Sequence, residues 1–246
     1  MMIKIRKCFF KILIFLFLLF ASNLSSFAQM NKEVVVGYAE TYEKLPKLSF
    51  TTSSFAEYDG CPAIEYMVKP TLKTSKTHHI ISTRRKQFNL RKYKDYGGND
   101  GFRGYEFLGF YPRLKMFAIT ESSTTEHLGF SSLVLIDSLS SYQYHVVSIG
   151  DGAVEAPIPS AQSKYLVYFY NWPYEDNSCF IGLLKVNHLS KPDKMLVEKA
   201  SYDTRKWAVE SIKWLDDEIF YVKAFTVKPH QRQGRRLYQY LKGKIE

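Results

Sequence analysis

Apolar and polar residues alternate in short runs along most of the chain, and turn residues bound each run. A period of two is typical of β-strands that bury one face. The clearest runs predict strands at residues 33–38, 115–120, 132–136, 142–147, 165–170, 179–186 and 219–227. Weaker runs predict strands near residues 48–55, 63–69 and 78–83, and a short helix around residues 86–95. Long amphipathic helical periodicity is missing after residue 28, so we expect an all-β, antiparallel protein.

A strand–turn–strand pattern occurs three times, with starts roughly 50 residues apart. Its copies are residues 105–120, 155–170 and 209–224, and a second hairpin with a turn at residues 137–141 follows the first copy. This arrangement resembles the blades of a β-propeller. The resemblance implies a propeller-like or partial-propeller fold of about four blade-like units. The alternative is a β-sandwich or meander, in which short strands are also evenly spaced.

Residues 1–28 have the pattern of a cleavable signal peptide. Four basic residues precede or adjoin an apolar run at residues 12–21, and Ser26 and Ala28 place small residues where a signal peptidase cuts. The run is about half of the roughly 20 apolar residues that a membrane-spanning helix needs. We therefore expect cleavage after Ala28, a periplasmic or secreted protein, and no transmembrane segment after cleavage.

The mature chain has a size that suits one all-β domain at residues 29–246. We divide it into an irregular first part at residues 29–104, blade-like repeats at 105–225, and a basic C-terminal tail at 226–246. Cleavage lowers the net charge from +10 to +6, because the signal peptide holds four basic residues and no acidic one. A positive net charge favours a partner with an acidic surface. The oligomeric state stays open.

The familiar motifs of catalytic and metal sites do not occur in the sequence. G-x-S-x-G, H-E-x-x-H and C-x-x-C are all missing, and the glycine-rich stretch at residues 95–101 lacks the alternating ligands of a calcium loop. We predict no catalytic residue, no metal site and no cofactor. An enzyme that assembles its site from distant residues stays open.

Cys61 and Cys179 are the two cysteines that lie beyond the signal peptide. An exported chain folds where disulfides persist, so one long-range bridge between them is one interpretation. Two separate buried thiols, which behave as small apolar residues, are the other. The sequence does not give the Cα separation that would decide between them.

Basic and aromatic residues gather in two places, at residues 84–96 and 228–244. Such mixtures bind nucleic acid in many intracellular proteins, but export argues against a nucleic-acid ligand. The loop at residues 171–174 adds aromatic residues of the types that are enriched in interface hot spots. From these segments we predict a binding face made of Trp172, Tyr174, Arg84, Arg85, Lys86 and Tyr93. The competing interpretation is a solvated charged loop and tail, with Trp172 capping the core.

These observations favour a non-catalytic protein-binding module, and one such role is an immunity or inhibitor protein against an antibacterial toxin. An all-β hydrolase or carbohydrate-binding protein that acts on glycans is the first alternative. A structural component of an envelope assembly is the second. The choice among them rests on compartment and on missing motifs, which is an association and not a site.

The signal-peptide pattern makes one prediction about processing. We expect the exported protein to begin at Gln29, because the small residues at positions 26 and 28 direct cleavage there. N-terminal sequencing of protein recovered from the exported fraction measures this directly. Recovery of material that retains residues 12–21, or that is released by detergent alone, would contradict it.

Overall fold

Most of the segments with alternating apolar and polar residues are β-strands in the computed structural model. The structure describes residues 32–37, 44–94, 101–146, 149–173, 175, 177–188, 191–227 and 235–245. Helices are limited, within these residues, to α3 (Phe55–Asp59) and the short 3-10 helix η1 (Pro192–Lys194). The all-β, mainly antiparallel prediction is confirmed. No helix of the described residues is long and apolar enough to cross a membrane.

The strands form four sheets, which we name A to D. In spatial order, sheet A consists of β1 (Glu33–Val36), β9 (Gln143–Val146), β8 (Leu128–Asp137), β7 (Met116–Thr125) and β6 (Arg103–Tyr111). Sheet B consists of β10 (Ile158–Pro159), β11 (Tyr165–Asn171), β12 (Cys179–Val186) and β13 (Leu196–Thr204). Sheet C consists of β14 (Ala208–Trp214), β15 (Ile219–Val227), β16 (Arg236–Lys244) and β2 (Ser49–Ser53). Sheet D consists of β3 (Lys73–Thr74), β4 (His78–Ser82) and β5 (Gln87–Arg91).

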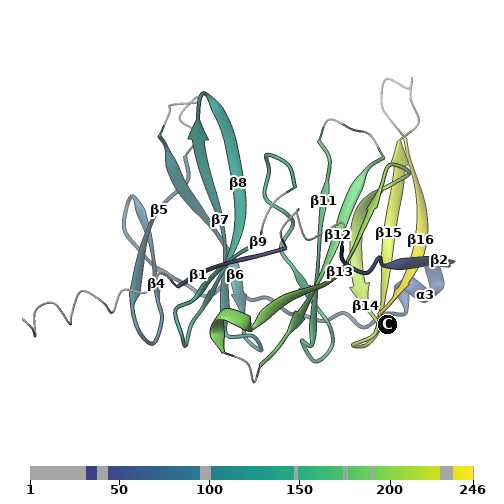
Figure 1. The fold of residues 1–246 in the computed structure, drawn as a ribbon, viewed down its shortest axis with the longest axis horizontal. Coiled ribbons are helices and arrows are strands. Elements are labelled where there is room, and N and C mark those ends of the chain that lie inside the picture. The colour runs from purple at the N-terminus through teal and green to yellow at the C-terminus, as the bar shows by residue number, and fades with distance from the viewer. Residues whose placement is uncertain are drawn as a thin grey trace, which may run out of the picture. The chain divides into compact units, whose positions relative to one another are not determined.

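The three predicted repeats are the first hairpins of three successive sheets. They form the antiparallel pairs β6–β7, β10–β11 and β14–β15. Sheets A and B continue with the next two strands of the chain, whereas sheet C takes its fourth strand, β2, from the N-terminal part. The sheets stand side by side in the order D, A, B, C (Figure 1). Among the described strands, none of the sheets closes on itself.

Two local predictions are wrong. The helix expected around residues 86–95 is β5, because Phe88 and Leu90 alternate with exposed polar neighbours and bury one face of a strand. The strand expected at residues 63–69 is an extended segment in which Val68 alone forms a bridge, to Phe110. The short helix α3 was not expected, although Ser54 and Glu57 form a capping box that begins it.

The predicted basic tail at residues 226–246 contains β16, the third strand of sheet C. Its residues alternate in the register with β15: Tyr240 lies opposite Lys223, and Leu241 lies opposite Val222. This alternation places basic and aromatic side chains on one face and apolar ones on the other. The irregular first part at residues 29–104 likewise contains β1, β2 and all of sheet D.

Sheet B is buried on both of its faces. Leu166 and Tyr168 of β11 belong to the core that sheet B shares with sheet A. Val167 and Phe169, which alternate with them, belong to the core shared with sheet C. A strand that is apolar on both faces reads as a continuous apolar run, and five consecutive residues of β11 are buried.

Three fully buried tyrosines place polar hydroxyls inside the A–B core, and each hydroxyl donates a hydrogen bond. Tyr111 donates to the Pro157 carbonyl at 2.7 Å, and Tyr144 donates to the Pro192 carbonyl at 2.6 Å. Tyr168 donates to the Glu198 carboxylate at 3.2 Å. These bonds remove the cost of burying the hydroxyls and connect each ring to a distant segment.

Cys61 and Cys179 are both free and buried, which agrees with the second interpretation. Cys61 packs with Tyr58 of α3 and Tyr221 of β15, on the outer face of sheet C. Cys179 lies in the core between sheets B and C. Sheet C therefore stands between the two thiols, and a bridge would require the layers to separate.

Asp217 joins the turn between β14 and β15 to the turn between β10 and β11. Its carboxylate accepts hydrogen bonds from Ser160 Oγ at 2.7 Å and Gln162 N at 2.8 Å, and Lys164 Nζ lies 3.3 Å away. Burial alone would raise the pKa of Asp217, but these donors outweigh it and lower the pKa below its ordinary value. This turn carboxylate thus connects sheets B and C.

We predict that Asp217→Asn lowers the free energy of unfolding by about 1–3 kcal/mol at neutral pH, because donors would lose their charged acceptor. A lowered pKa contributes stability above the ordinary pKa and loses it as the pH falls, so the effect should shrink in acid. Urea denaturation measures it, with Glu218→Gln in the same turn as control. Equal stability of the two variants at neutral pH would contradict the role of Asp217.

Glu198 on β13 is the half-buried carboxyl that accepts a hydrogen bond from the Tyr168 hydroxyl. A side chain at Gly37, next to β1, would contact both groups, and Glu198 Oε2 has no hydrogen-bond partner among the described residues. Burial raises the pKa of Glu198 from its ordinary 4.5 to about 7, against the opposing effects of the Tyr168 hydroxyl and the Lys47 charge.

We predict that wild-type stability falls, relative to Glu198→Gln, as the pH rises from 4.5 to about 7. In that window the native state holds a proton that the unfolded state has released, so unfolding becomes easier with pH. Urea midpoints at several pH values measure the difference, and the exposed Glu65→Gln is the matched control. Parallel pH profiles for wild type and Glu198→Gln would refute this account.

Candidate binding surfaces

The residues of the predicted basic cluster lie at two ends of sheet A. Arg84, Arg85 and Lys86 are exposed in the β4–β5 turn, where the Arg84 amide donates to the Ser138 carbonyl beside the β8–β9 turn. Tyr93 follows β5 and packs at 6.0 Å against Phe102, which lies at the opposite end of β7. The two halves are therefore about a strand length apart.

Trp172 lies at the Tyr93 end and is partly buried. Its ring packs edge-on against Tyr170 with centroids 5.4 Å apart, at the margin of the A–B core. This contact fits the competing interpretation, in which the indole caps the core. Tyr174 lies outside the described residues. The structure thus brings Tyr93 near the Trp172 loop and leaves Arg84, Arg85 and Lys86 elsewhere.

An extended segment at residues 62–70, which we name the strap, runs from sheet C to sheet A along the edges of the first strands. At its sheet A end Tyr66 stacks on Tyr111, and Val68 forms a two-way backbone pair with Phe110. Gly109 allows this approach, because a Cβ there would lie 2.6 Å from Met67 Cγ. The other end follows α3 on the outer face of sheet C.

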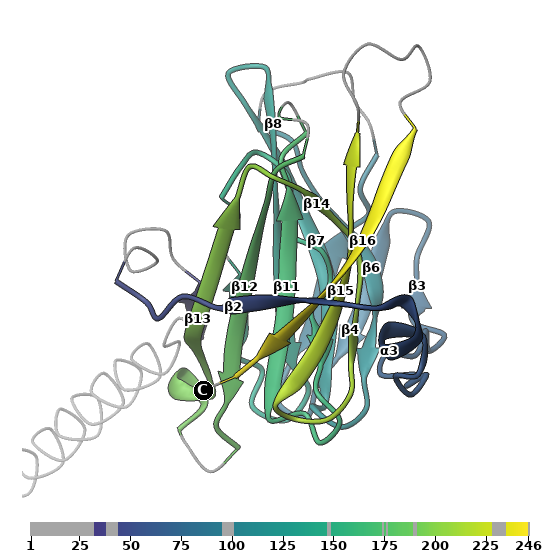
Figure 2. The ribbon, with the colours of Figure 1, turned by 90° about the vertical axis from the view of Figure 1, so that its right-hand side faces the viewer.

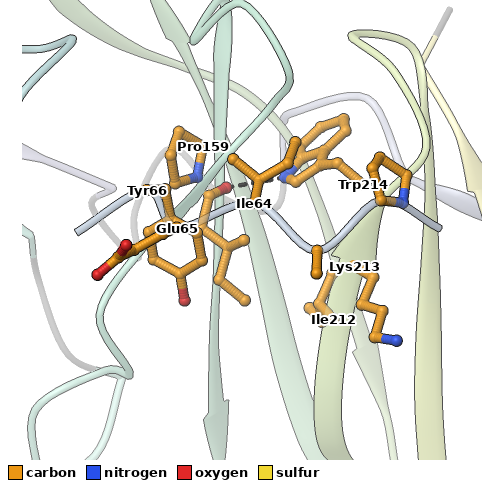
Figure 3. A pocket seen from close by; sticks show the side chains of 10 residues that line it. Ile64, Glu65, Tyr66, Pro159, Ile212, Lys213 and Trp214 are labelled. Atoms are coloured by element: carbon orange, nitrogen blue, oxygen red, sulfur yellow. Dashed lines mark hydrogen bonds between the residues drawn. The ribbon is translucent and has the colours of Figure 1, made fainter.

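A cavity of about 420 Å³, which we name the strap pocket, lies where the strap passes β10 and β14 (Figure 3). Its walls are largely apolar and include Ile64, Pro159, Ile212 and Trp214. The Trp214 indole N–H donates to the Ile158 carbonyl at 2.8 Å, so its polar group is already satisfied. The ring is 3% exposed, so it contributes a small apolar part of the pocket wall from the core behind it.

Two charged side chains lie at the rim of the strap pocket. Figure 3 shows Glu65 and Lys213 pointing to different sides, away from the apolar walls. Lys213 Nζ lies 4.5 Å from the centre of the Tyr58 ring and 4.0 Å from the Asp59 carboxylate. Lys213 thereby connects the pocket to the outer face of sheet C.

The outer face of sheet C carries a set of basic side chains that we name the cationic face: Lys213, Lys223, Arg236, Lys242 and Lys244. Figure 2 shows this side of the sheet, with α3 and β16 toward the viewer. Aromatic residues of the same face hold several of the cations. Lys223 lies over Tyr238 at 4.3 Å and Arg236 over Phe225 at 4.2 Å. Such contacts orient long side chains while leaving their charges accessible.

The acidic residues near the cationic face do not neutralise it. Glu210 pairs with Arg236 at 2.5 Å, and Asp59 lies at the outer limit of an ion pair with Lys213. No carboxylate of the described residues forms an ion pair with Lys223 or Lys242, and the Glu57 carboxylate on α3 interacts with Lys242 only over a longer distance. The face therefore keeps positive charge next to an apolar cavity.

A separate ionisable cluster lies on the face of sheet A that sheet D partly covers. Glu121 pairs with Arg103, and its second oxygen lies 3.9 Å from His145 Nδ1. The Tyr105 hydroxyl donates weakly to the same carboxylate at 3.4 Å. Across the described part of the chain, no group of His, Cys, Asp or Glu is arranged to hold a metal ion.

The chain matches no protein-family model, no curated protein and no solved structure. Its function must therefore be inferred from the surfaces themselves.

Sequence reasoning missed the strap pocket, because its walls come from three segments that are distant in sequence. Trp214 at the end of the first strand of the third repeat was the available signal, since an indole needs a partner for its N–H when buried.

Proposed function

We propose that this protein is a non-catalytic protein-binding module whose partner presents an apolar anchor side chain within an acidic surface. One observation carries the proposal: the strap pocket and the cationic face are contiguous and share Lys213. A desolvated apolar anchor supplies most of the affinity in many interfaces. Complementary charge beside it accelerates association and excludes partners of the wrong sign.

The compartment and the biological role are part of the same proposal. The signal-peptide pattern at residues 1–28 supports export to the periplasm or beyond. In that compartment an inhibitor or immunity protein against an antibacterial toxin is the role that we propose. A glycan-acting or carbohydrate-binding protein and a structural envelope component are the alternatives. A neighbouring toxin gene in the genome would favour the immunity role, and a neighbouring polysaccharide-utilisation cluster would favour the glycan role.

We further propose that the four sheets are blade-like units of an open propeller. The repeated strand order of sheets A, B and C supports this proposal, as does the completion of sheet C by a strand from the other end of the unit. In such an arrangement the strap runs along the edges where the first strands of the blades meet. The alternative is a stack of meanders without an axis.

The apolar half of the proposal predicts a large effect of Ile64→Asp. Ile64 is 37% exposed, so the protein should fold, but a carboxylate in the strap pocket should repel an apolar anchor. We expect a loss of at least ~2 kcal/mol of binding free energy, seen as faster dissociation. The measurement uses a partner that is first captured from the native envelope with immobilised mature protein, then identified and purified.

The matched control for Ile64→Asp is Val197→Asp, which places the same carboxylate at an exposed apolar position on sheet B. It should bind the purified partner as wild type does. Equal losses for the two variants would show that the strap pocket is not the anchor site. Glycan hydrolysis by the purified protein would show that the class of function is wrong.

The electrostatic half of the proposal predicts slower association when Lys223 and Lys242 are both changed to Glu. The effect should fade as salt rises, because exposed charges are screened. The matched control is the pair Arg84→Glu and Arg85→Glu, which makes the same charge change at the β4–β5 turn. If the association rate falls for the Arg84→Glu and Arg85→Glu variant and not for the Lys223→Glu and Lys242→Glu variant, the binding site is at the β4–β5 turn instead.

A further inference from the structure

A second cleft opens between sheets A and B, near the β7–β8 hairpin and the end of β11. Its cavity measures about 380 Å³, which is within the range of small-molecule sites. The strap pocket adjoins the opposite end of β14: Asn171 in the cleft hydrogen-bonds both backbone groups of Val209, whereas the pocket is lined by Trp214. The two cavities are therefore separate sites.

The floor of the cleft continues the inward-facing rows of β7 and β8 with hydroxyl groups. Met116 and Ala118 of β7 lie in the A–B core. Further along the same face of the strand, Ser122 and Thr124 line the cleft. Ser131 follows the same rule on β8, and its hydroxyl lies 3.1 Å from that of Ser122.

Aromatic and apolar side chains form the walls on both sides of this floor. Tyr93, which is 48% exposed, and Phe102 stand on the sheet A side, and Tyr170 and Pro173 stand on the sheet B side. Tyr170 packs tightly on the turn between β9 and β10, because a Cβ at Gly150 would lie 2.4 Å from its hydroxyl oxygen. That contact fixes the turn that carries Asp151.

Asp151 is the one charged side chain among the described residues that line the cleft. Its carboxylate can accept two hydrogen bonds from neighbouring hydroxyl groups of a ligand, whereas the serine hydroxyls can donate or accept. The described lining provides no cation for an anionic ligand. The exposed face of Tyr93 can pack against an apolar ring surface.

We propose that this cleft binds a short neutral saccharide. A sugar ring combines an apolar C–H face with hydroxyls that both donate and accept, and the cleft combines aromatic walls with hydroxyls and a carboxylate. This site is independent of the protein-binding surface proposed above. It adds a glycan ligand to a protein whose partner surface lies on sheet C.

The experiment presents mature protein with three neutral probes at millimolar concentration: cellotriose, maltotriose and tri-N-acetylchitotriose. Saturation-transfer NMR detects contact and calorimetry gives affinity. We expect at least one trisaccharide to bind, and Tyr93→Ala and Asp151→Asn each to weaken it by about fivefold or more. Ser131→Phe, which fills the floor, should abolish binding.

Phe55→Ala is the matched control, because Phe55 is an aromatic residue that is 58% exposed on α3, away from the cleft. It should leave saccharide affinity unchanged. Thermal denaturation tests that each variant folds. If Ser131→Phe does not fold, Tyr93→Ala and Asp151→Asn still decide the test. The proposal would be overturned if none of the three trisaccharides bound, or if a trisaccharide bound all the cleft variants as tightly as it binds wild type. Binding of trilysine in place of all three sugars would overturn it as well.

Discussion

Burial of sheet B on both faces is the constraint on which the rest of the structure depends. Five consecutive residues of β11 are buried, and their side chains enter two different cores. A strand buried on both faces needs a sheet on each side. The inward faces of sheets A and C are accordingly apolar, and sheet A needs sheet D for its second face.

Buried tyrosines convert this layering into a defined arrangement. Apolar packing alone tolerates sliding between sheets, whereas a hydroxyl inside a core must meet an acceptor at one position. Tyr111, Tyr144 and Tyr168 each find that acceptor in a segment outside their own strand. Gly182 leaves room for Tyr168, because any Cβ at that position would overlap the ring. Tyr111 and Tyr144 thereby fix sheet A against the segments that lead into β10 and β13, whereas the Tyr168 bond lies within sheet B.

The sequence was sufficient where local patterning decides the structure. The predicted strands at residues 179–186 and 219–227 have the bounds of β12 and β15, since both are long apolar runs ended by polar residues. It was insufficient where partners are distant. Nothing local shows that Arg236–Lys244 would pair between β15 and β2, or that sheet C would separate Cys61 from Cys179. The mistaken helix at residues 86–95 differs, because the alternation of Phe88 and Leu90 was visible in the sequence.

The candidate sites show the same division. Residue types were informative, since Tyr93 does line a cleft and basic residues do gather with aromatic ones on sheet C. Grouping by nearness in sequence was misleading, because a β4–β5 turn and the residue after β5 lie at opposite ends of a strand. The strap pocket needs Ile64, Pro159 and Trp214, and only the folded arrangement of three sheets brings these residues together.

The position of β2 has a consequence for the order in which the protein can form. β2 is synthesised near the start of the chain, yet its partner β16 is made almost at the end. Until then β2 is an unpaired strand that must avoid other edges, and we expect the β2–β16 pair to form late because its partners are far apart in sequence. A nascent chain can complete sheets A and B while sheet C still awaits its last residues. The strap is joined to β2 through α3, so we expect the strap pocket to be completed at that final step.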